Sequence, residues 1–328
     1  MSVSVFAPIS VGNVSVGFDT LGLALTPVDG SLVGDIVTVE AFDQSSVKQQ
    51  SNNTENALSS EFVLAGTHAS RLPAGAEKNI VWRCYQAFEK ALSQKQVDAQ
   101  AIKITLHKNI PVSSGLGSSA CSVVAAFAAL NTFYNTPFSE HELLLMMGEL
   151  EGEISGSVHY DNVAPCYLGG LQLMLNDEQQ VTQPIPTFDD CYWVIAYPDV
   201  EVSTKAAREI LPQNYSRATL ITFGQNLAGF IDASHRQNKQ QAFRYLTDIV
   251  AEPYRAQLLP NFADTKAHLL ASGALAVGIS GSGPTLFAVT DDRQKAEAFQ
   301  QWLNDNYLQT PEGFVHICQV DHQGARKI

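Results

Sequence analysis

The feature that most constrains this chain is a turn rich in glycine and serine, PVSSGLGSSACS, at residues 111–122. The segment before it, AIKITLHKNIP, alternates apolar and polar residues through Ile102, Ile104 and Leu106, which predicts a half-buried strand. The segment after it, SSACSVVAAFAALNTFY, is apolar on most faces and predicts a buried helix that ends before Pro137. A strand, a glycine-rich turn and a helix in this order form a phosphate-binding arrangement.

The chemistry of such a turn explains why these residue types suit an anion. A helix N-terminus leaves four backbone N–H groups unpaired and carries a partial positive charge. Gly115 and Gly117 would let the backbone close on the anion, and the hydroxyls of Ser118, Ser119 and Ser122 could reach phosphate oxygens or a hard metal ion. The turn therefore predicts a phosphate site held locally by backbone and hydroxyl groups.

Two better-known phosphate loops compete with this interpretation. A P-loop requires G-x-x-x-x-G-K-[ST], and the chain contains no Gly-Lys pair, so a P-loop is excluded. GLGSSA also satisfies the dinucleotide fingerprint, which expects a second strand ending in an acidic residue about 20 residues later. That position falls at Glu140, within the capping box of an expected helix, which weakens a dehydrogenase interpretation. The alternative that this turn only leads into a buried helix and binds no anion stays open.

An acidic residue on an apolar helix face is a second signal. Glu151 continues the stripe of Leu144 and Met147 at helical spacing, on a helix that the capping box of Ser139 and Glu142 begins. A buried carboxylate is unfavourable unless a cation or donors pair with it, and Mg²⁺ is a candidate. The alternative is that the helix ends near residue 152 and Glu151 is solvated.

A second glycine-serine motif, GISGSGPTLFAV, predicts a strand interrupted by Gly278, Gly281 and Gly283. Glycines within a strand pattern mark a bulge or a close backbone approach, and a tight β-turn is the alternative. Two glycine-serine motifs and an acid on an apolar stripe together indicate a nucleoside triphosphate with its metal.

Composition narrows the class of partner. The chain of 328 residues carries 33 acidic and 20 Lys or Arg side chains, a formal net charge of -13, so a non-specific nucleic-acid surface is not expected. No basic leader and no run of 18 or more apolar residues is found, so we expect a cytoplasmic protein without a membrane partner. Its length suits two domains, which we place at residues 1–168 and 169–328.

The remaining patterns predict ordinary elements and a polar insertion. Five scattered cysteines without a C-x-x-C pair are expected to be buried apolar residues rather than disulfides or zinc ligands. The segment DQSSVKQQSNNTENALSS, residues 43–60, is expected to form a surface loop. DIVTVEAF, LQLML, CYWVIAYP and FVHICQV read as strands, the last of them closing the fold, and NIVWRCYQAFEKAL as an amphipathic helix.

Five segments of the chain resemble a known family. PVSSGLGSSA is similar to the second motif of the GHMP kinases, small-molecule kinases named for galactose, homoserine, mevalonate and phosphomevalonate, and GISGSGPTLFA is similar to their third. APISVGNVSVGFDTLGLAL, ELEGEISGSVHYDNVAPCYLGG and AEPYRAQLLP resemble the branch that acts on homoserine. The resemblance covers nearly the whole chain.

The resemblance implies an α+β fold of two domains, the first like domain 2 of ribosomal protein S5 and the second ferredoxin-like. It implies ATP-dependent phosphorylation of the L-homoserine hydroxyl to O-phospho-L-homoserine in threonine biosynthesis, by a homodimer. Mg²⁺ would be held by Ser118 and Glu151. The residues that the resemblance places against ATP are Pro111, Val112, Ser113, Ser114, Gly115, Leu116, Gly117, Ser118, Ser119, Ala120 and Cys121.

Homoserine is a zwitterion with a hydroxyl, so its site needs a carboxylate clamp, an ammonium acceptor and a hydroxyl positioner. The resemblance assigns the clamp to Arg208 and Arg255 and the acceptor to Asp19. It places further substrate contacts at Asn13, His159 and Asn162.

The catalytic base stays open at this point. Asp161 matches an aspartate that helps activate the hydroxyl in mevalonate kinases, but the N-terminal segment lacks the lysine that works beside it there. Direct attack by a hydroxyl that Asn162 positions is the alternative, because a loose transition state asks little of the nucleophile.

Competing functions are a GHMP kinase acting on a sugar or mevalonate, and a ligand-binding relative without catalysis. A neutral sugar would leave Arg208, Arg255 and Asp19 without partners. A non-catalytic protein would have no need of an acid at position 151.

Overall fold

The structure is a computed structural model that describes residues 2–42, 60–73, 75–156 and 158–328. The predicted surface loop at residues 43–60 therefore lies outside the described residues, apart from its last position. Helices and strands are both abundant, which confirms the expected α+β class.

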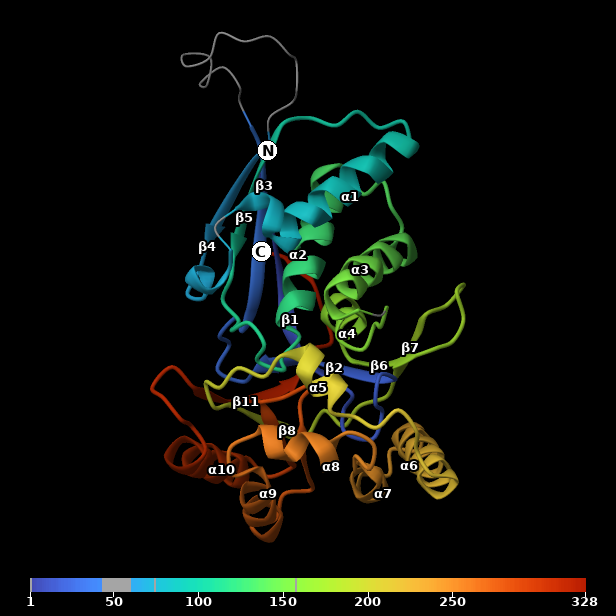
Figure 1. Cartoon of the computed structure of the whole chain (residues 1–328), viewed down its shortest axis with the longest axis vertical. Helices are drawn as coiled ribbons and strands as arrows, with labels where there is room; N and C mark the ends of the chain where they lie inside the picture. The colour runs from blue at the N-terminus through green and yellow to red at the C-terminus, as the bar shows by residue number, and fades with distance from the viewer. Residues whose placement is uncertain (1, 43–59, 74, 157) are drawn as a thin grey trace.

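The first half of the chain builds a sheet with helices on one face (Figure 1). Its strands, in the order β4-β5-β3-β1-β2, have these bounds: β1 (Ser2–Gly12), β2 (Leu21–Pro27), β3 (Gly34–Ala41), β4 (Glu61–Ala65) and β5 (Ile102–His107). In β5 every second residue from Ile102 is buried, which confirms the period of two read from the sequence. That burial fixes which face of the sheet carries helices.

The helices on that face are α1 (Ile80–Gln94), α2 (Ser118–Phe133), α3 (Glu140–Ser155) and α4 (Val163–Leu168). The first three of these confirm sequence predictions. Helix α2 is buried on nearly every side and packs on β1 and β3, between the sheet and helices α1, α3 and α4. The capping box of Ser139 and Glu142 begins α3 as expected, because each side chain accepts from the other's backbone N–H.

The second half contains a strand-helix-strand-strand-helix-strand unit. Its members are β8 (Tyr192–Tyr197), α9 (Phe262–Ala271), β9 (Ala276–Ile279), β10 (Leu286–Thr290), α10 (Arg293–Asn306) and β11 (Phe314–Val320). The strands lie in the order β11-β8-β10-β9 and are antiparallel, which is the ferredoxin-like arrangement. The single interrupted strand expected over GISGSGPTLFAV is wrong: β9 and β10 form a hairpin, with Gly278 inside β9 and with Gly281 and Gly283 in the turn.

The remaining elements complete the chain. Four helices follow β8 and lead to α9, and α5 lies between the two halves (Figure 1). These helices are α5 (Thr204–Glu209), α6 (Arg217–His235), α7 (Lys239–Tyr245) and α8 (Glu252–Arg255). The remaining strands are β6 (Leu171–Met174), β7 (Thr182–Ile185) and β12 (Arg326–Lys327), and the 3-10 turns are Ala69–Arg71, Ala76–Lys78 and Ala256–Leu258. Strand β12 follows β11, so β11 is not the last strand.

The two halves share one continuous sheet. Strand β2 pairs with β1 along one edge, and along its other edge first with β6 and then with β11. Strand β12 returns to pair with β1. The domain limits at 1–168 and 169–328 stay a prediction.

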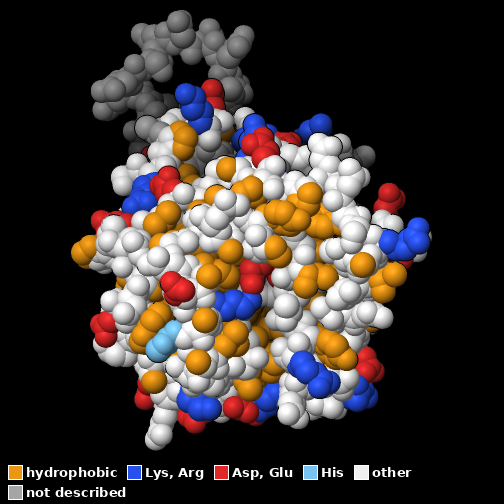
Figure 2. Space-filling model, turned by 60° about the horizontal axis from the view of Figure 1, so that its bottom comes forward, with side chains coloured by type: hydrophobic (Ala, Val, Ile, Leu, Met, Phe, Trp, Pro, Cys, Tyr) orange, Lys and Arg blue, Asp and Glu red, His pale blue; other side chains and the backbone are white. Residues whose placement is uncertain are grey.

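Burial and charge agree with a globular chain. All five cysteines are buried and free, as expected. No helix in the described ranges is long and apolar enough to cross a bilayer. On the face shown in Figure 2, basic and acidic side chains are scattered among one another, so its described part presents no field of a single sign.

Candidate active site

The glycine-serine turn ends at the uncapped N-terminus of α2. Gly117 is the residue before the helix, its φ of 66° is left-handed, and no side chain caps the first turn. The backbone N–H groups at the start of α2 therefore stay available to an anion. The turn, α3, the segment before α1 and the β9–β10 turn line a cavity of about 360 Å³.

The two glycine-serine motifs meet at this cavity. Ser280 Oγ donates to the Gly115 carbonyl at 2.6 Å, and Thr285 Oγ1 donates to the Ser114 carbonyl at 2.7 Å. A Cβ on Gly115 would lie 2.6 Å from the Ser280 carbonyl oxygen, and Gly115 has a φ of 80°. Glycine is required here by conformation and by space. The close backbone approach predicted for the second motif is confirmed, with the first motif as its partner.

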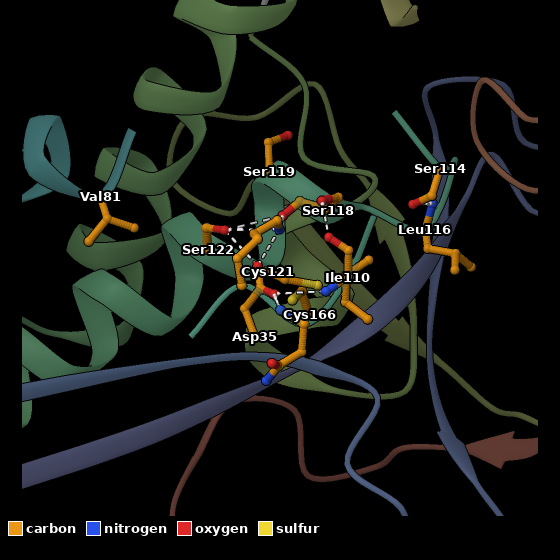
Figure 3. A network of polar contacts seen from close by, with 12 residues as sticks. Asp35, Val81, Ile110, Ser114, Leu116, Ser118, Ser119, Cys121, Ser122 and Cys166 are labelled. Atoms are coloured by element: carbon orange, nitrogen blue, oxygen red, sulfur yellow. Dashed lines mark hydrogen bonds and ion pairs between the residues drawn. The ribbon is translucent and has the colours of Figure 1, made fainter. Parts of the chain in front are cut away.

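A buried ion pair between Lys108 and Asp35, which the sequence patterns did not predict, holds the end of the turn. Lys108 Nζ lies 2.5 Å from Asp35 Oδ2 and also donates to the Ser118 carbonyl at 2.7 Å and to Ser122 Oγ at 3.2 Å. Ser122 Oγ donates to the same Asp35 oxygen at 2.6 Å (Figure 3). Asp35 accepts in addition from the Asn109 backbone N–H. The pair joins β3, the end of β5 and the first turn of α2.

Glu151 is buried beside the turn, so the solvated alternative is wrong. Its side chain is 6% exposed, and burial raises the pKa of Glu151. Ser119 Oγ donates to Glu151 Oε1 at 2.5 Å, whereas Ser118 Oγ donates to the Ile110 carbonyl at 3.3 Å. Figure 3 shows Ser119 above the Asp35 network with its hydroxyl directed away from it. The serine that contacts Glu151 is therefore Ser119, and the assignment of Ser118 as a metal ligand stays a prediction.

This donor set suits a hard cation that also binds phosphate. Glu151 and the neighbouring hydroxyls offer oxygen atoms, which Mg²⁺ prefers. No group of three His, Cys, Asp or Glu residues within the described ranges could hold a metal ion by itself. A magnesium ion here would take its other ligands from the nucleotide and from water, as Mg²⁺ does in many kinases.

The HYDN segment forms a second polar cluster. His159 Nδ1 contacts Asp161 Oδ1 at 3.0 Å, Asn162 Nδ2 donates to Asp161 Oδ2 at 3.3 Å, and Ser10 Oγ donates to Asn162 Oδ1 at 3.0 Å. The backbone of Gly12 covers this cluster, because a Cβ there would lie 2.6 Å from Asp161 Oδ2 and from Asn162 Nδ2. His159 and Asn162 line the cavity, and Asp161 does not.

Next to this cluster lies a buried guanidinium. Arg255 is 4% exposed, and it donates from Nε to the Ala207 carbonyl at 3.0 Å and from Nη1 to the Gly281 carbonyl at 2.8 Å. No carboxylate of the described residues forms an ion pair with Arg255, and burial lowers the pKa of Arg255. Among the described residues the guanidinium donates hydrogen bonds to carbonyls and lies over the Phe18 ring, 5.3 Å from its centroid, and a nearly buried cation in this setting favours an anionic ligand.

Arg208 and Asp19 contact each other rather than standing apart. Arg208 Nη1 and Nη2 donate to the two Asp19 oxygens at 2.9 and 3.0 Å, a bidentate pair. Burial is the largest single influence on Arg208 and lowers its pKa, but the hydrogen bond to Asp19 and the charges of Asp19 and Asp161 together raise the pKa of Arg208 above its usual value. Each side chain is about one third exposed, at 33% and 32%. The pair therefore lies open to exchange its partners for those of a ligand.

Asn13 holds the loop that carries Asp19. Its Nδ2 donates to the Gly281 carbonyl at 3.0 Å, and its Oδ1 accepts from the Asp19 backbone N–H at 2.9 Å. Asn13, Val14 and Ser15 all have positive φ, a conformation that a β-branched residue rarely adopts. A substrate contact by Asn13 stays a prediction, whereas its role in shaping the loop is plain from these bonds.

The structure separates the predicted ATP-binding stretch into a part that lines the cavity and a part that faces the core. Leu116, Ala120 and Cys121 are fully buried, and Cys121 Sγ contacts the Pro8 carbonyl, so these side chains face the core. The cavity-lining members of the stretch are Val112, Ser113, Ser114, Gly115, Gly117, Ser118 and Ser119. Lining residues that the sequence analysis did not single out are Leu72, Lys78, Asn79, Ile80, Arg83, Lys108, Thr204 and Ser282.

Comparison with known proteins identifies the family. The sequence matches the family model of the GHMP kinase N-terminal domain over residues 79–170 and that of the GHMP kinase C-terminal domain over residues 230–308. A homoserine kinase from Cytophaga hutchinsonii is 32% identical, with a TM-score of 0.87 over 100% of this chain and 97% of that one. The chain belongs to the GHMP kinase family. It is therefore a phosphotransferase of the kinase class.

More distant GHMP kinase structures share the fold. A candidate homoserine kinase from Listeria monocytogenes is 21% identical, with a TM-score of 0.69 over 99% of each chain. Mevalonate kinase from L. major, in complex with R-mevalonate, is 16% identical, with a TM-score of 0.63 over 96% of this chain and 95% of that one. At these identities the likeness concerns the fold alone, so the acceptor must be argued from the site.

Proposed function

We propose that this GHMP kinase transfers the γ-phosphate of ATP to the side-chain hydroxyl of L-homoserine and yields O-phospho-L-homoserine for threonine biosynthesis. Support comes from the similarity to the Cytophaga hutchinsonii homoserine kinase and from the charges beside the cavity. An amino-acid acceptor is the kind of alcohol that these charges fit best.

The observation that carries the proposal is the buried Arg255 without an ion-pair partner among the described residues, next to the exposed pair of Arg208 and Asp19. A substrate carboxylate would satisfy Arg255 and could share Arg208. The ammonium group of the same molecule would then take the place of Arg208 at Asp19. A neutral sugar offers neither charge, and mevalonate offers no ammonium group.

The phosphate end of the reaction falls to the turn and α2. The triphosphate of ATP would lie against Gly115 and Gly117 and the free N–H groups of the first turn of α2. Glu151, with the hydroxyl of Ser119 or Ser118, would hold Mg²⁺, which supplies positive charge to the phosphate oxygens during transfer. Lys108, paired with Asp35, holds the start of α2 through its hydrogen bond to the Ser118 carbonyl.

The acceptor end is arranged by the HYDN cluster. Asn162 and His159 line the cavity, and the charges of Asp19 and Arg208 act on His159, so the reacting hydroxyl would lie against these two residues. Positioning of this kind supplies much of the rate in phosphoryl transfer, because little covalent chemistry is asked of the protein.

The test is release of ADP from ATP and Mg²⁺ with L-homoserine, L-serine, L-threonine, mevalonate or galactose as acceptor. We expect L-homoserine to give the highest kcat/KM. In Arg255→Ala, kcat/KM for L-homoserine should fall roughly 10- to 150-fold, since a hydrogen bond to a charged group contributes about 1.5–3 kcal/mol. Arg236→Ala, which removes an exposed arginine paired with Asp232, is the matched control and should leave kcat/KM unchanged.

Two outcomes would contradict the proposal. If mevalonate or galactose is the better acceptor, the acceptor assignment is wrong although the kinase family stands. If ATP binds and no acceptor stimulates ADP release, the chain is a ligand-binding relative, and the roles of Arg255 and Asp19 have to be abandoned.

A further inference from the structure

His159 presents a buried ring nitrogen that has no hydrogen-bond partner among the described residues. Its Nε2 is shielded from solvent and unpaired, while its Nδ1 contacts Asp161 Oδ1 at 3.0 Å. The side chain is 11% exposed and lines the cavity. A buried polar atom normally finds a partner, so an unpaired one in a cavity wall points to a ligand atom.

The contact with Asp161 decides which ring nitrogen carries the proton. Asn162 Nδ2 donates to Asp161 Oδ2, so both carboxylate oxygens act as acceptors and His159 Nδ1 must donate. In the neutral imidazole the other nitrogen, Nε2, then carries a lone pair. The unpaired atom in the cavity wall is therefore an acceptor.

Asp161 itself is poorly placed to take a proton from a substrate. It is 3% exposed, both of its oxygens are engaged, and it does not line the cavity. The backbone of Gly12 lies so close that a Cβ there would come within 2.6 Å of Asp161 Oδ2. A substrate hydroxyl can approach His159 without moving this backbone.

The charges that face His159 place it between the two ends of the reaction. Besides Asp161 on its own loop, these are Asp19 from the loop after β1 and Arg208 from α5, on the acceptor side. Glu151 from α3 acts on it from the phosphate side. Burial lowers the pKa of His159, but the contact with Asp161 outweighs it and leaves the pKa above its usual value.

We propose that Nε2 of His159 accepts the proton of the acceptor hydroxyl, and that Asp161 is a positioning residue that holds the imidazole in the Nδ1–H tautomer. This inference rests on the proposed function. A lone pair of the hydroxyl oxygen forms the new bond to the γ-phosphorus, the O–H bond breaks with its electron pair left on the oxygen, and the proton passes to Nε2. The bond from the γ-phosphorus to the β,γ-bridging oxygen breaks, its electron pair stays on ADP, and His159 later releases the proton to water.

The experiment compares wild type, His159→Gln and Asp161→Asn in steady-state ADP release with L-homoserine over a range of pH. His322→Gln is the matched control, because His322 Nε2 contacts Asp189 Oδ1 at 2.9 Å in an exposed His–Asp pair away from the cavity. Circular dichroism and binding of a fluorescent ATP analogue establish that each variant is folded and binds nucleotide.

We expect kcat of His159→Gln to fall about 100-fold or more with little change in KM for L-homoserine, as for loss of a general base. Wild-type kcat should decline as the pH falls through the pKa of His159, and this acidic limb should be absent in His159→Gln. In Asp161→Asn the limb should move to lower pH, since the carboxylate that raises the pKa is gone. His322→Gln should match wild type.

Three results would overturn the inference. One is a His159→Gln enzyme with wild-type kcat and only a raised KM, which would make His159 a binding residue. Another is an unchanged acidic limb in His159→Gln. The third is loss of turnover in Asp161→Asn while His159→Gln stays active, which would make Asp161 the base. If wild type shows no ADP release that depends on L-homoserine, the proposed function fails instead.

Discussion

Replacing Lys108 by methionine tests how much the buried ion pair of Lys108 and Asp35 stabilises the protein around the glycine-serine turn. The lysine is 2% exposed and Asp35 is fully buried, and their atoms lie 2.5 Å apart. At an effective dielectric constant of about 20, Coulomb attraction at this separation is roughly 7 kcal/mol before desolvation is subtracted. Removal of one partner of a buried pair typically destabilises a protein by about 3–5 kcal/mol, because the other charge stays buried alone.

The local hydrogen bonds place the expected loss at the lower end of that range. In Lys108→Met, Asp35 still accepts from Ser122 Oγ and from the Asn109 and Ile110 backbone N–H groups. We therefore expect the free energy of unfolding at neutral pH to fall by about 3 kcal/mol. Urea unfolding monitored by circular dichroism measures this difference.

A surface lysine provides the control, and a double variant provides the decisive comparison. Lys239 pairs with Asp190 and Asp291 but is 26% exposed, so Lys239→Met should change the free energy of unfolding by no more than about 1 kcal/mol. Lys108→Met combined with Asp35→Asn should lose less than the sum of the single losses. Equal losses in Lys108→Met and Lys239→Met, or strict additivity in the double variant, would refute the reasoning.

Two further predictions concern the cavity. Glu151→Gln should abolish Mg²⁺-dependent ADP release, yet its free energy of unfolding at neutral pH should be higher than that of wild type. Burial raises the folded-state pKa of Glu151, so wild type regains stability as the pH falls through that pKa, and the difference between the two proteins should shrink. A variant that is less stable than wild type at pH 7 would contradict this. Gly115→Ala should weaken binding of a fluorescent ATP analogue, and it should lower the urea midpoint of unfolding by more than Gly30→Ala does. Both glycines have a φ of 80°, but of these two positions only Gly115 would bring the added Cβ against backbone atoms. Equal effects of the two substitutions would contradict this prediction.

Local patterns in the sequence predicted the helices and strands around the proposed phosphate site. The period of β5, the apolar texture of α2 and the capping box of α3 were each sufficient to place an element, and the helical stripe placed Glu151 inside. Each of these signals depends on a few neighbouring residues, so it can be recognised from the sequence alone.

Lys108 was missed for a physical reason. It follows Ile102, Ile104 and Leu106 at the same spacing of two, so the strand pattern already directed it inward. Lysine is seldom fully buried without a partner, and its partner Asp35 lies 73 residues away on another strand. Only the pairing of β3 with β5 brings the two together.

At the proposed acceptor end, the sequence did not predict how the side chains are arranged. The sequence assigned Arg208 to the carboxylate clamp and Asp19 to the ammonium group, and the structure joins these two side chains to each other. Side-chain partners across 189 positions depend on the packing of α5 against the loop after β1, which no local pattern encodes. The same holds for the contact between Gly115 and Ser280, which joins two motifs that the sequence could only describe separately.

The pairing of β2 with β11 has a consequence for synthesis on the ribosome. The second half of β2, which ends at Pro27, is synthesised well before β11, which begins at Phe314. While translation proceeds, that half of β2 must stay without its neighbour on one edge, and an unpaired strand edge is a template for association with other chains. The nascent protein should therefore depend on protection of this edge until β11 emerges, even though most of the nucleotide cavity has been synthesised long before.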